Sequence, residues 1–404
     1  MPKIGLIREE KNPPDSRVPL TPKQCAELKK NMPDFSIVVE GAPSRCFSNQ
    51  EYLDAGISLQ EDLSDCDILM GVKEVPISKI MPQKTYFFFS HTKKKQPYNQ
   101  KLMQAFIEKK IRMIDYEALT YDDGNRIIGF GFFAGVVGAH NGLLTYGKKH
   151  GLFNLKAAHD CRDMEEMLAQ YNDINLPPIK IVLTGSGRVA SGLLHIMQAL
   201  DIKSVEPKDF LEREYDYPVY TLLKGDDLYE NKITKAYHRD EFHQHPEDYN
   251  CKFLPFAGEA NLLLNGIYWD TKIARLFEKE DAQKKGFKIS VIADVTCDID
   301  GSVPLNLMAT TIADPVYGVS KRNLNKVEPF QNTNDIIDIM AVDNLPNELP
   351  RDASKHFGEH IMKFVLPELL AGTSTVLDRA TICENGELTP YFAYLSDYAY
   401  GLDN

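Results

Sequence analysis

The sequence predicts an α/β protein with two domains, and three features lead to this prediction. The chain has 404 residues, 43% hydrophobic and 26% charged, so it is an ordinary folded chain longer than one core usually serves. Short apolar runs alternate with amphipathic stretches from the first residues onward, which is typical of strands and helices around parallel sheets. A glycine-rich turn at Gly185 joins one such run directly to a helix-like segment.

Residues 1–125 predict one α/β unit. Helices are expected at residues 21–31 and 99–109, between apolar runs that fit buried strands. The predicted strands are residues 3–7, 36–40, 68–72, 85–89 and 112–114. The segment GFGFFAGVVGAHNGLLTYGKKHG follows, and its closely spaced small residues predict a long, tightly packed helix that ends at Gly151. This helix is expected to carry the chain into the second domain.

A second alternation follows this helix. Its predicted strands are residues 180–183, 204–206, 261–264, 288–293 and 310–312. Residues 209–250 are polar and rich in Asp, Glu, Lys and Tyr, and they give no clear prediction. Residues 335–344 predict a returning connection, and residues 356–370 predict an amphipathic helix.

Charge and composition exclude several classes of protein. The chain has 46 Lys+Arg and 58 Asp+Glu, a formal charge of −12, so no nucleic-acid partner is expected. The longest nearly uncharged apolar stretch, residues 127–139, has 13 residues, below the roughly 18 that a membrane span needs. The N-terminus has no secretory-signal pattern. Seven cysteines without a CxxC pair fit reduced thiols, so we expect a cytoplasmic protein without a metal site.

The segment KIVLTGSGRVASG carries a GxGxxA form of the dinucleotide-binding fingerprint. Gly185 would permit the tight turn, Gly187 would let a pyrophosphate approach the backbone, and Ala190 would let the helix pack on the strand. Glu206 stands 19 positions after Gly187, close to the spacing of about 20 expected for a carboxylate on the adenosine ribose. The alternative is a glycine turn that binds nothing.

Four basic side chains stand beside predicted strand ends or turns. Lys73 and His91 each follow an apolar run, and the carboxyl ends of strands are where open α/β sheets bind ligands. Burial there would suit both side chains to proton transfer; the alternative is a solvated lysine and a histidine that caps the next segment. Arg17 and Arg126 adjoin turns, where they would clamp substrate carboxylates or simply form ion pairs.

The acidic loop ADVTCDIDG follows another apolar run. It contains Asp294, Asp298 and Asp300. Such a loop suits a divalent ion, but without a phosphate partner in view it favours hydrogen bonding near a cofactor.

Six segments together resemble the saccharopine-handling branch of the alanine dehydrogenase and pyridine nucleotide transhydrogenase superfamily. They are IGLIREEKNPPDSRVPLTP, LMGVKEVP, YFFFSHTKKKQ, IDYEALTYDDGNRIIGFGFFAGVVGA, NGIYWD and VDNLPNELP. The likeness is to the lysine–2-oxoglutarate reductase half of aminoadipic semialdehyde synthase, and to the lysine-forming saccharopine dehydrogenase of fungi. It implies two Rossmann-like domains with parallel sheets and an interdomain cleft. Residues 1–135 with 343–404 would form the substrate and catalytic domain, and residues 136–342 the dinucleotide-binding domain.

The resemblance also implies residue roles. It makes Lys73 and His91 the catalytic acid–base pair. The substrate-binding residues that it implies are Arg17, Arg126, Glu74 and Glu117. Together with the glycine fingerprint, it implies cofactor binding by Gly185, Ser186, Gly187, Arg188, Val189, Glu206, Asn265, Ile267, Tyr268, Asp298, Asn344 and Leu345.

The implied activity is the interconversion of saccharopine with L-lysine and 2-oxoglutarate by hydride transfer with NAD or NADP. Glu206 favours NAD slightly, because a carboxylate repels a 2′-phosphate. One alternative is an alanine dehydrogenase-like enzyme; the loop GSGRVASG differs from the GAGxVG of alanine dehydrogenases, which weakens this alternative. The other is a non-catalytic nucleotide-binding module. The expected partners are the small-molecule substrates, and a homo-oligomer is left open.

Overall fold

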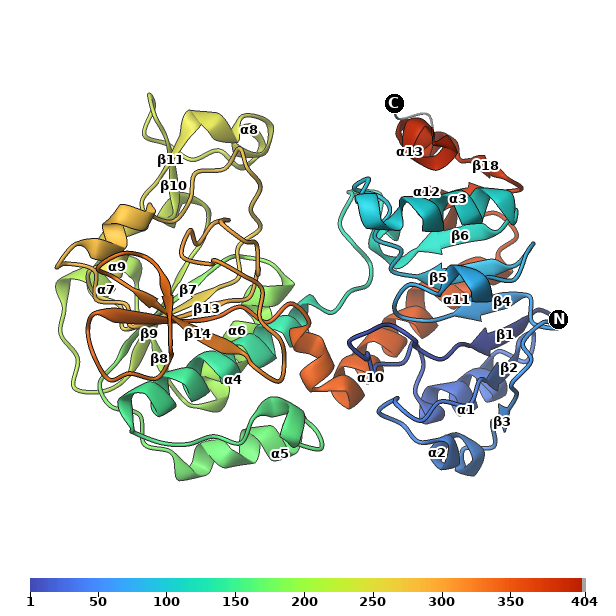
Figure 1. Cartoon of the computed structure of the whole chain (residues 1–404), viewed down its shortest axis with the longest axis horizontal. Helices are drawn as coiled ribbons and strands as arrows, with labels where there is room; N and C mark the ends of the chain where they lie inside the picture. Colours follow the sequence, from blue (N-terminus) through green and yellow to red (C-terminus); the bar gives the residue numbers. More distant parts are fainter. Residues whose placement is uncertain (402–404) are drawn as a thin grey trace. The chain divides into compact units, whose positions relative to one another are not determined.

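The computed structural model describes residues 1–401, which form two compact units (Figure 1). Unit 1 consists of Met1–Phe130 together with the segment that starts at Pro350. Unit 2 is Gly131–Leu349. Each unit contains one large, mostly parallel sheet with helices packed on it, so the predicted α/β class with parallel sheets is confirmed.

Unit 1 is built on an eight-stranded sheet. Its strands are β1 (Lys3–Leu6), β2 (Ser36–Val39), β3 (Ser58–Leu59), β4 (Ile68–Met70), β5 (Thr85–Phe88), β6 (Arg112–Asp115), β17 (Thr381–Glu384) and β18 (Glu387–Leu388). They lie in the order β18-β17-β6-β5-β4-β1-β2-β3. The first six strands pair in parallel, and the C-terminal segment adds β17 and β18 as an antiparallel edge on β6.

The helices of unit 1 come from both ends of the chain. They are α1 (Pro22–Asn31), α2 (Asn49–Asp54), α3 (Gln100–Glu108), α10 (Pro350–His360), α11 (Leu366–Leu370), α12 (Thr375–Ala380) and α13 (Ser396–Tyr400). The start of α1 is fixed by a capping box between Thr21 and Gln24. The helix predicted at residues 356–370 begins earlier, as α10, and a π-helical segment at Ile361–Val365 separates α10 from α11.

Unit 2 repeats this sheet pattern. Its strands are β7 (Lys180–Thr184), β8 (Lys203–Ser204), β9 (Val219–Leu223), β12 (Leu262–Asn265), β13 (Val291–Asp294), β14 (Val316–Ser320), β15 (Lys326–Val327) and β16 (Ile336–Met340), with a separate hairpin of β10 (Tyr229–Asn231) and β11 (Tyr249–Cys251). The order in the large sheet is β15-β14-β16-β13-β12-β7-β9-β8, with β14 and β15 antiparallel to the rest.

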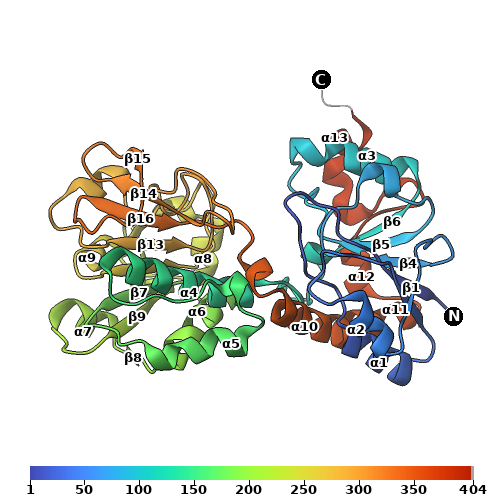
Figure 2. The same ribbon diagram turned by 60° about the horizontal axis from the view of Figure 1, so that its bottom comes forward.

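Two helices of unit 2 cross with almost no space between their backbones. The helices of this unit are α4 (Gly131–His150), α5 (Met164–Ala169), α6 (Arg188–Ala199), α7 (Pro207–Glu212), α8 (Arg239–Gln244) and α9 (Leu254–Ala257). α4 lies along α6 (Figure 2) and also contacts β12, β13 and β16. Small residues in α4 permit this packing, as the sequence predicted for this segment. Among residues 1–401, no helix has the length and apolar character that crossing a membrane requires.

Two predictions for unit 2 were wrong, and a segment without a clear prediction contains a strand. The segment 335–344 is not a connection but contains β16, a strand of the central sheet. Its Asp338 looks polar in the sequence, but the buried side chain is paired with the buried ammonium of Lys149 at 3.3 Å. Residues 310–312 form only an isolated bridge from Thr310 to Val342, and the strand lies further on, in β14. The polar stretch 209–250 contains β9, which pairs directly with β7.

The unit boundaries also differ from the predicted divisions at 135/136 and 342/343. α4 starts at Gly131, so the whole helix belongs to unit 2. At the other end, a 3-10 turn at Leu345–Glu348 completes unit 2, and α10 opens the returning segment.

Candidate active site

Three predicted site residues of unit 1 lie at one edge of its sheet. Lys73 comes shortly after β4, His91 after β5 and Glu117 after β6. These strands are parallel neighbours, so their carboxyl ends meet at the same edge. The expectation from the sequence, that Lys73 and His91 each follow a buried strand, therefore describes their position in the structure.

His91 is held by Glu74. Nδ1 of His91 lies 2.5 Å from Oε1 of Glu74, and the other carboxylate oxygen of Glu74 lies 3.2 Å from Nζ of Lys11. Burial opposes ionisation of Glu74, but the hydrogen bond and charge of His91, with help from Lys11, hold its pKa at about 2. The backbone of His91 is in the left-handed region, with φ of +51°. Glu74 thus remains a carboxylate and fixes one ring nitrogen.

The amine of Lys73 is in a setting that favours its neutral form. The side chain is half-buried, and burial lowers the pKa of Lys73 below its usual value. The positive charges of Arg17 and Lys11 lower it further, against the opposing effect of Asp15 and Glu74. An amine with a lowered pKa can both take up and release a proton closer to neutral pH.

The two predicted substrate arginines are both paired within unit 1. Arg17 is 3% exposed, and its Nε and Nη2 donate to the two oxygens of Asp15 at 2.9 and 2.6 Å. Its guanidinium also lies over the ring of Phe130, 4.2 Å from the centroid. Arg126 is half-exposed and forms an ion pair with Glu117. The ion-pair alternative therefore describes both arginines, although Arg17 is buried rather than on the surface.

A buried aspartate that the sequence did not single out ties two of these loops together. Oδ2 of Asp115 accepts hydrogen bonds from the backbone N–H of Ser90 at 3.1 Å and from its hydroxyl at 2.5 Å. Oδ1 accepts the backbone N–H of Glu117 at 2.7 Å. Burial raises the pKa of Asp115, and these hydrogen bonds oppose the rise. Because Ser90 precedes His91, Asp115 orders the segments that carry His91 and Glu117.

The glycine loop of unit 2 has the geometry of an anion cradle. Gly185 has φ of +114°, and a Cβ there would lie 2.5 Å from the carbonyl oxygen of Gly266, so only glycine fits. Ser186, Gly187 and Arg188 are exposed where α6 begins, and a Cβ on Gly187 would meet no atom within 4 Å. Open space beside helical N–H groups suits a pyrophosphate, so these residues fit a dinucleotide cofactor.

Glu206 does not occupy the place predicted for it. The ribose-binding carboxylate of this fold follows the strand next to the fingerprint strand. That neighbour is β9, whose Leu223 carbonyl accepts the N–H of Gly185 at 3.1 Å, whereas β8 pairs only with β9. Glu206 is an exposed residue that precedes α7 beyond this edge strand. The segment Lys224–Asp227 follows β9 instead, and the sequence missed it because β9 itself was not predicted.

Asn265 is also corrected from a cofactor contact to a core residue. It is fully buried, and its amide oxygen accepts the hydroxyl of Thr184 at 2.6 Å. Its amide nitrogen donates to Asp294 at 2.8 Å and to Ser302 at 2.9 Å. These bonds use both amide hydrogens and tie β12 to its neighbours, so the fully buried side chain of Asn265 has a structural role.

The remaining predicted cofactor residues divide by exposure. Ile267 and Leu345 are buried, and the side chain of Leu345 packs near Gly138 of α4. Tyr268 is 73% exposed, Asp298 is exposed and Asn344 is partly exposed. Val189 is also partly exposed, in the first turn of α6. Within residues 1–401, no cluster of three His, Cys, Asp or Glu side chains is arranged to hold a metal ion.

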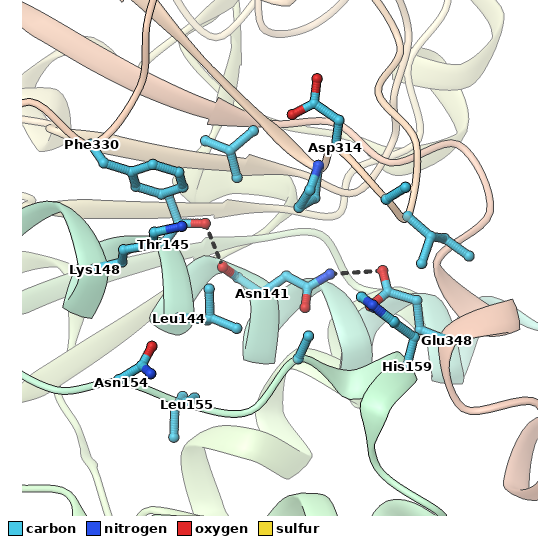
Figure 3. A pocket seen from close by; sticks show the side chains of 15 residues that line it. Asn141, Leu144, Thr145, Lys148, Asn154, Leu155, His159, Asp314, Phe330 and Glu348 are labelled. Carbon is cyan, nitrogen blue, oxygen red and sulfur yellow. Dashed lines mark hydrogen bonds and ion pairs between the residues drawn. The ribbon is translucent and has the colours of Figure 1, made fainter.

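A separate pocket of about 340 Å³ lies in unit 2, beside α4 (Figure 3). Its polar wall contains Glu348, which is buried and accepts a hydrogen bond from Asn141 at 2.9 Å. His159 lies 3.5 Å from the other carboxylate oxygen, and its hydrogen bond to Glu348 raises the pKa of His159. None of the predicted site residues lines this pocket, and its Glu348 is paired with His159.

Comparison with known proteins finds a family model that matches the first part of the chain. The model of the alanine dehydrogenase/PNT N-terminal domain matches residues 5–137. The predicted resemblance to that superfamily is thereby confirmed, and Lys73, Glu74, His91 and Glu117 all lie in the segment that the model matches.

Curated relatives match nearly the whole chain. Alpha-aminoadipic semialdehyde synthase of Arabidopsis thaliana is 30% identical over 97% of this chain and 41% of its own length. The chain thus spans less than half of that relative. Saccharopine dehydrogenase (NAD(+), L-lysine-forming) of Yarrowia lipolytica is 26% identical over 93% of this chain and 94% of its own length. A solved L-alanine dehydrogenase has a TM-score of 0.66 at 16% identity, covering 98% of this chain and 99% of its own, which supports the two-domain α/β fold.

Proposed function

We propose that this chain is a nicotinamide-dependent oxidoreductase that interconverts saccharopine with L-lysine and 2-oxoglutarate. The observation that carries the proposal is the placement of Lys73, with its lowered pKa, at the same sheet edge as the Glu74–His91 pair. The open glycine cradle before α6 supports a dinucleotide cofactor in unit 2. The names of the curated relatives support the substrate.

The reaction needs proton transfer at nitrogen and at oxygen. A bound nicotinamide would supply the hydride acceptor or donor. In the lysine-forming direction, Nζ of Lys73 takes the proton of the secondary amine of saccharopine as the substrate becomes an imine. Water then adds to the imine carbon, and His91 takes the proton of this water. Since Glu74 holds Nδ1 of His91, Nε2 is the nitrogen that exchanges this proton. The carbinolamine collapses as its C–N bond breaks and its hydroxyl becomes the ketone of 2-oxoglutarate, while Lys73 returns a proton to the nitrogen of the departing lysine.

Substrate charge is the second requirement. Saccharopine carries three carboxylates, so the site needs local positive charge in a chain whose net charge is −12. Arg126 is half-exposed, and we propose that it exchanges its partner Glu117 for a substrate carboxylate. Arg17 stays paired with Asp15 and contributes through its charge.

We propose that the cofactor is NAD. The carboxylate that contacts its adenosine ribose is proposed to come from the residues after β9 and not from Glu206. Asp226 and Asp227 place two carboxylates at this strand end, which favours a free 2′-hydroxyl over a 2′-phosphate. Lys224 in the same turn favours the phosphate, so the preference is slight. The NAD(+) in the name of the Yarrowia lipolytica relative supports the same choice. Location in the cytoplasm and assembly into a homo-oligomer stay predictions.

The deciding experiment follows nicotinamide absorbance with purified protein, 2-oxoglutarate and either NADH or NADPH. L-lysine is added first and ammonium replaces it in a parallel reaction. Oxidation that requires lysine supports the proposal and identifies the cofactor. Oxidation with ammonium but not lysine contradicts the substrate and favours a simple amino-acid dehydrogenase. Nucleotide binding without oxidation contradicts catalysis and favours a binding module.

A further inference from the structure

The carboxylate of Glu9 clamps the backbone of the loop that carries Lys73. Oε1 of Glu9 accepts the N–H of Val72 at 2.6 Å, and Oε2 accepts the N–H of Lys73 at 2.9 Å. Each oxygen therefore binds one of two consecutive amides. No residue-type pattern in the sequence pointed to this contact, which joins positions more than sixty residues apart.

The strand arrangement brings the two segments together. β1 and β4 are parallel neighbours, so Glu9, shortly after β1, faces the turn that follows β4. The N–H of Ile7 continues the ladder to the carbonyl of Met70 at 3.0 Å. A Cβ on Gly71 would lie 2.8 Å from the side chain of Ile7 and 3.2 Å from Oε1 of Glu9. The turn is therefore closely packed against Glu9 on one side.

The surroundings of Glu9 raise the pKa of its carboxyl group. Burial raises the pKa of Glu9 to about 8, and the two N–H groups from Val72 and Lys73 oppose this rise. Asp15 raises it further, whereas Arg17 lowers it. The surroundings therefore disfavour the ionised form of Glu9, and the two N–H groups that hold its carboxyl group belong to the lysine loop.

We propose that Glu9 is a positioning residue for Lys73. The side chain of Lys73 has four rotatable bonds, so a small rotation of its backbone moves Nζ by a large distance. A carboxylate that fixes two successive amides removes that rotation. Displacement of a reacting group by about 1 Å is enough to lower a rate on the order of a hundredfold. The catalytic part of this inference rests on the function proposed above, whereas the clamp itself does not.

The test compares Glu9→Gln with Glu10→Gln in the full chain. Glu10 is the next residue and has the same chemistry, but it pairs with Lys79. Glutamine at position 9 keeps one acceptor oxygen and turns an N–H₂ group toward the other amide. Hydrogen exchange at the amides of Val72 and Lys73 should become about tenfold faster in Glu9→Gln and should not change in Glu10→Gln.

Steady-state kinetics then connect the clamp to the reaction. Glu9→Gln should lower kcat between about tenfold and a hundredfold, with little change in KM for lysine or for the cofactor. Glu9→Asp keeps a carboxyl group with two acceptor oxygens and should recover part of kcat. A residue that only stabilised the fold would not produce a loss confined to kcat. Thermal melting checks the fold, and if Glu9→Gln does not fold, Glu9→Asp decides the question by the same two measurements.

The outcomes separate the clamp from the proposed reaction. Unchanged exchange at Val72 and Lys73 in Glu9→Gln overturns the inference. Faster exchange with unchanged kcat overturns the positioning role. If the natural chain itself shows no lysine-dependent oxidation, the proposed function fails, and the exchange measurement still decides whether Glu9 holds the loop.

Discussion

Glu74 lies next to Lys73 in the chain and holds Nδ1 of His91 at 2.5 Å through its Oε1. One short turn after β4 therefore supplies both the amine of the site and the partner of its imidazole. Glu9 binds the backbone of the same turn. Movement of this turn would displace both proton-transfer groups together.

Replacing Lys73 by Met should lower kcat by about 10²- to 10⁴-fold, because the general acid–base group is lost. Nucleotide binding, measured by the quenching of protein fluorescence, should stay the same. Lys79→Met is the matched control, since Lys79 is exposed and pairs with Glu10. Equal kcat values for the two variants would remove Lys73 from the mechanism.

Replacing Glu74 by Gln should lower kcat/KM by roughly tenfold or more, since His91 loses a charged partner. The pKa of Glu74 is about 2, so the natural side chain is ionised throughout the working range. The charge of Glu74 raises the pKa of Lys73, so the pH profile of kcat/KM should shift toward acid in the variant, with no titration of Glu74 itself in the natural chain from about pH 6 to about pH 9. A profile that keeps its natural position would show that the charge of Glu74 does not act on Lys73.

The two glycines of the fingerprint should respond differently to alanine. Gly185→Ala places a Cβ against the oxygen of Gly266 at positive φ, so it should lower the melting temperature and abolish nucleotide binding. Gly187→Ala meets open space and should melt normally, yet it should weaken NADH binding by about tenfold or more, because the methyl group enters the pyrophosphate site. Normal binding by Gly187→Ala would place the cofactor elsewhere.

Cofactor preference should follow the end of β9. Glu206→Gln should leave the ratio of kcat/KM for NADH and NADPH unchanged, because Glu206 follows the edge strand β8. Asp226→Asn should shift that ratio toward NADPH by roughly tenfold, since one charge that repels the 2′-phosphate is removed. The opposite pattern, with an effect of Glu206 alone, would restore the sequence-based assignment.

Buried His140 should make unit 2 sensitive to acid. Burial lowers the pKa of His140 to about 4, while the ring bonds to the hydroxyl of Tyr171 at 2.8 Å and to the carbonyl of Lys156 at 3.0 Å. On acidification the imidazole is protonated in the unfolded chain before it is protonated in the folded chain. The stability that neutral His140 contributes is therefore complete above about pH 6.5 and is lost as the pH falls toward 4. The free energy of unfolding, measured with urea, should fall by roughly 3 kcal/mol over this pH range. The His140→Gln variant should not show this fall.

The sequence predicted strands well where apolar residues run without interruption. β1, β2, β4 and β5 match their predicted positions within a residue or two, because each is a short apolar run that becomes buried. β16 was missed because Asp338 interrupts its run. Its burial depends on Lys149, a partner from a distant helix that no local pattern reveals.

Site residues that directly follow a strand could be predicted from the sequence. Residues that act by hydrogen bonding to a distant segment could not. Lys73 and His91 were found because each follows an apolar run. Glu9 and Asp115 were missed, since their hydrogen bonds go to backbone amides of other loops, and backbone amides have no sequence signature. Glu206 failed for a related reason, because a spacing in the sequence does not say which strand lies beside which.

Gly135 and Gly192 set a limit on how this protein can be redesigned. A methyl group on either would lie 2.0 Å from a backbone oxygen of the facing helix, at Val189 or Phe132. The two helix backbones are in direct contact at these glycines, so no side chain lies between them. Side-chain substitutions there therefore cannot shift the first turn of α6 by small amounts. A mutant library aimed at a different dinucleotide should therefore vary residues 224–227, while the same number of changes along this helix crossing would yield mostly misfolded clones.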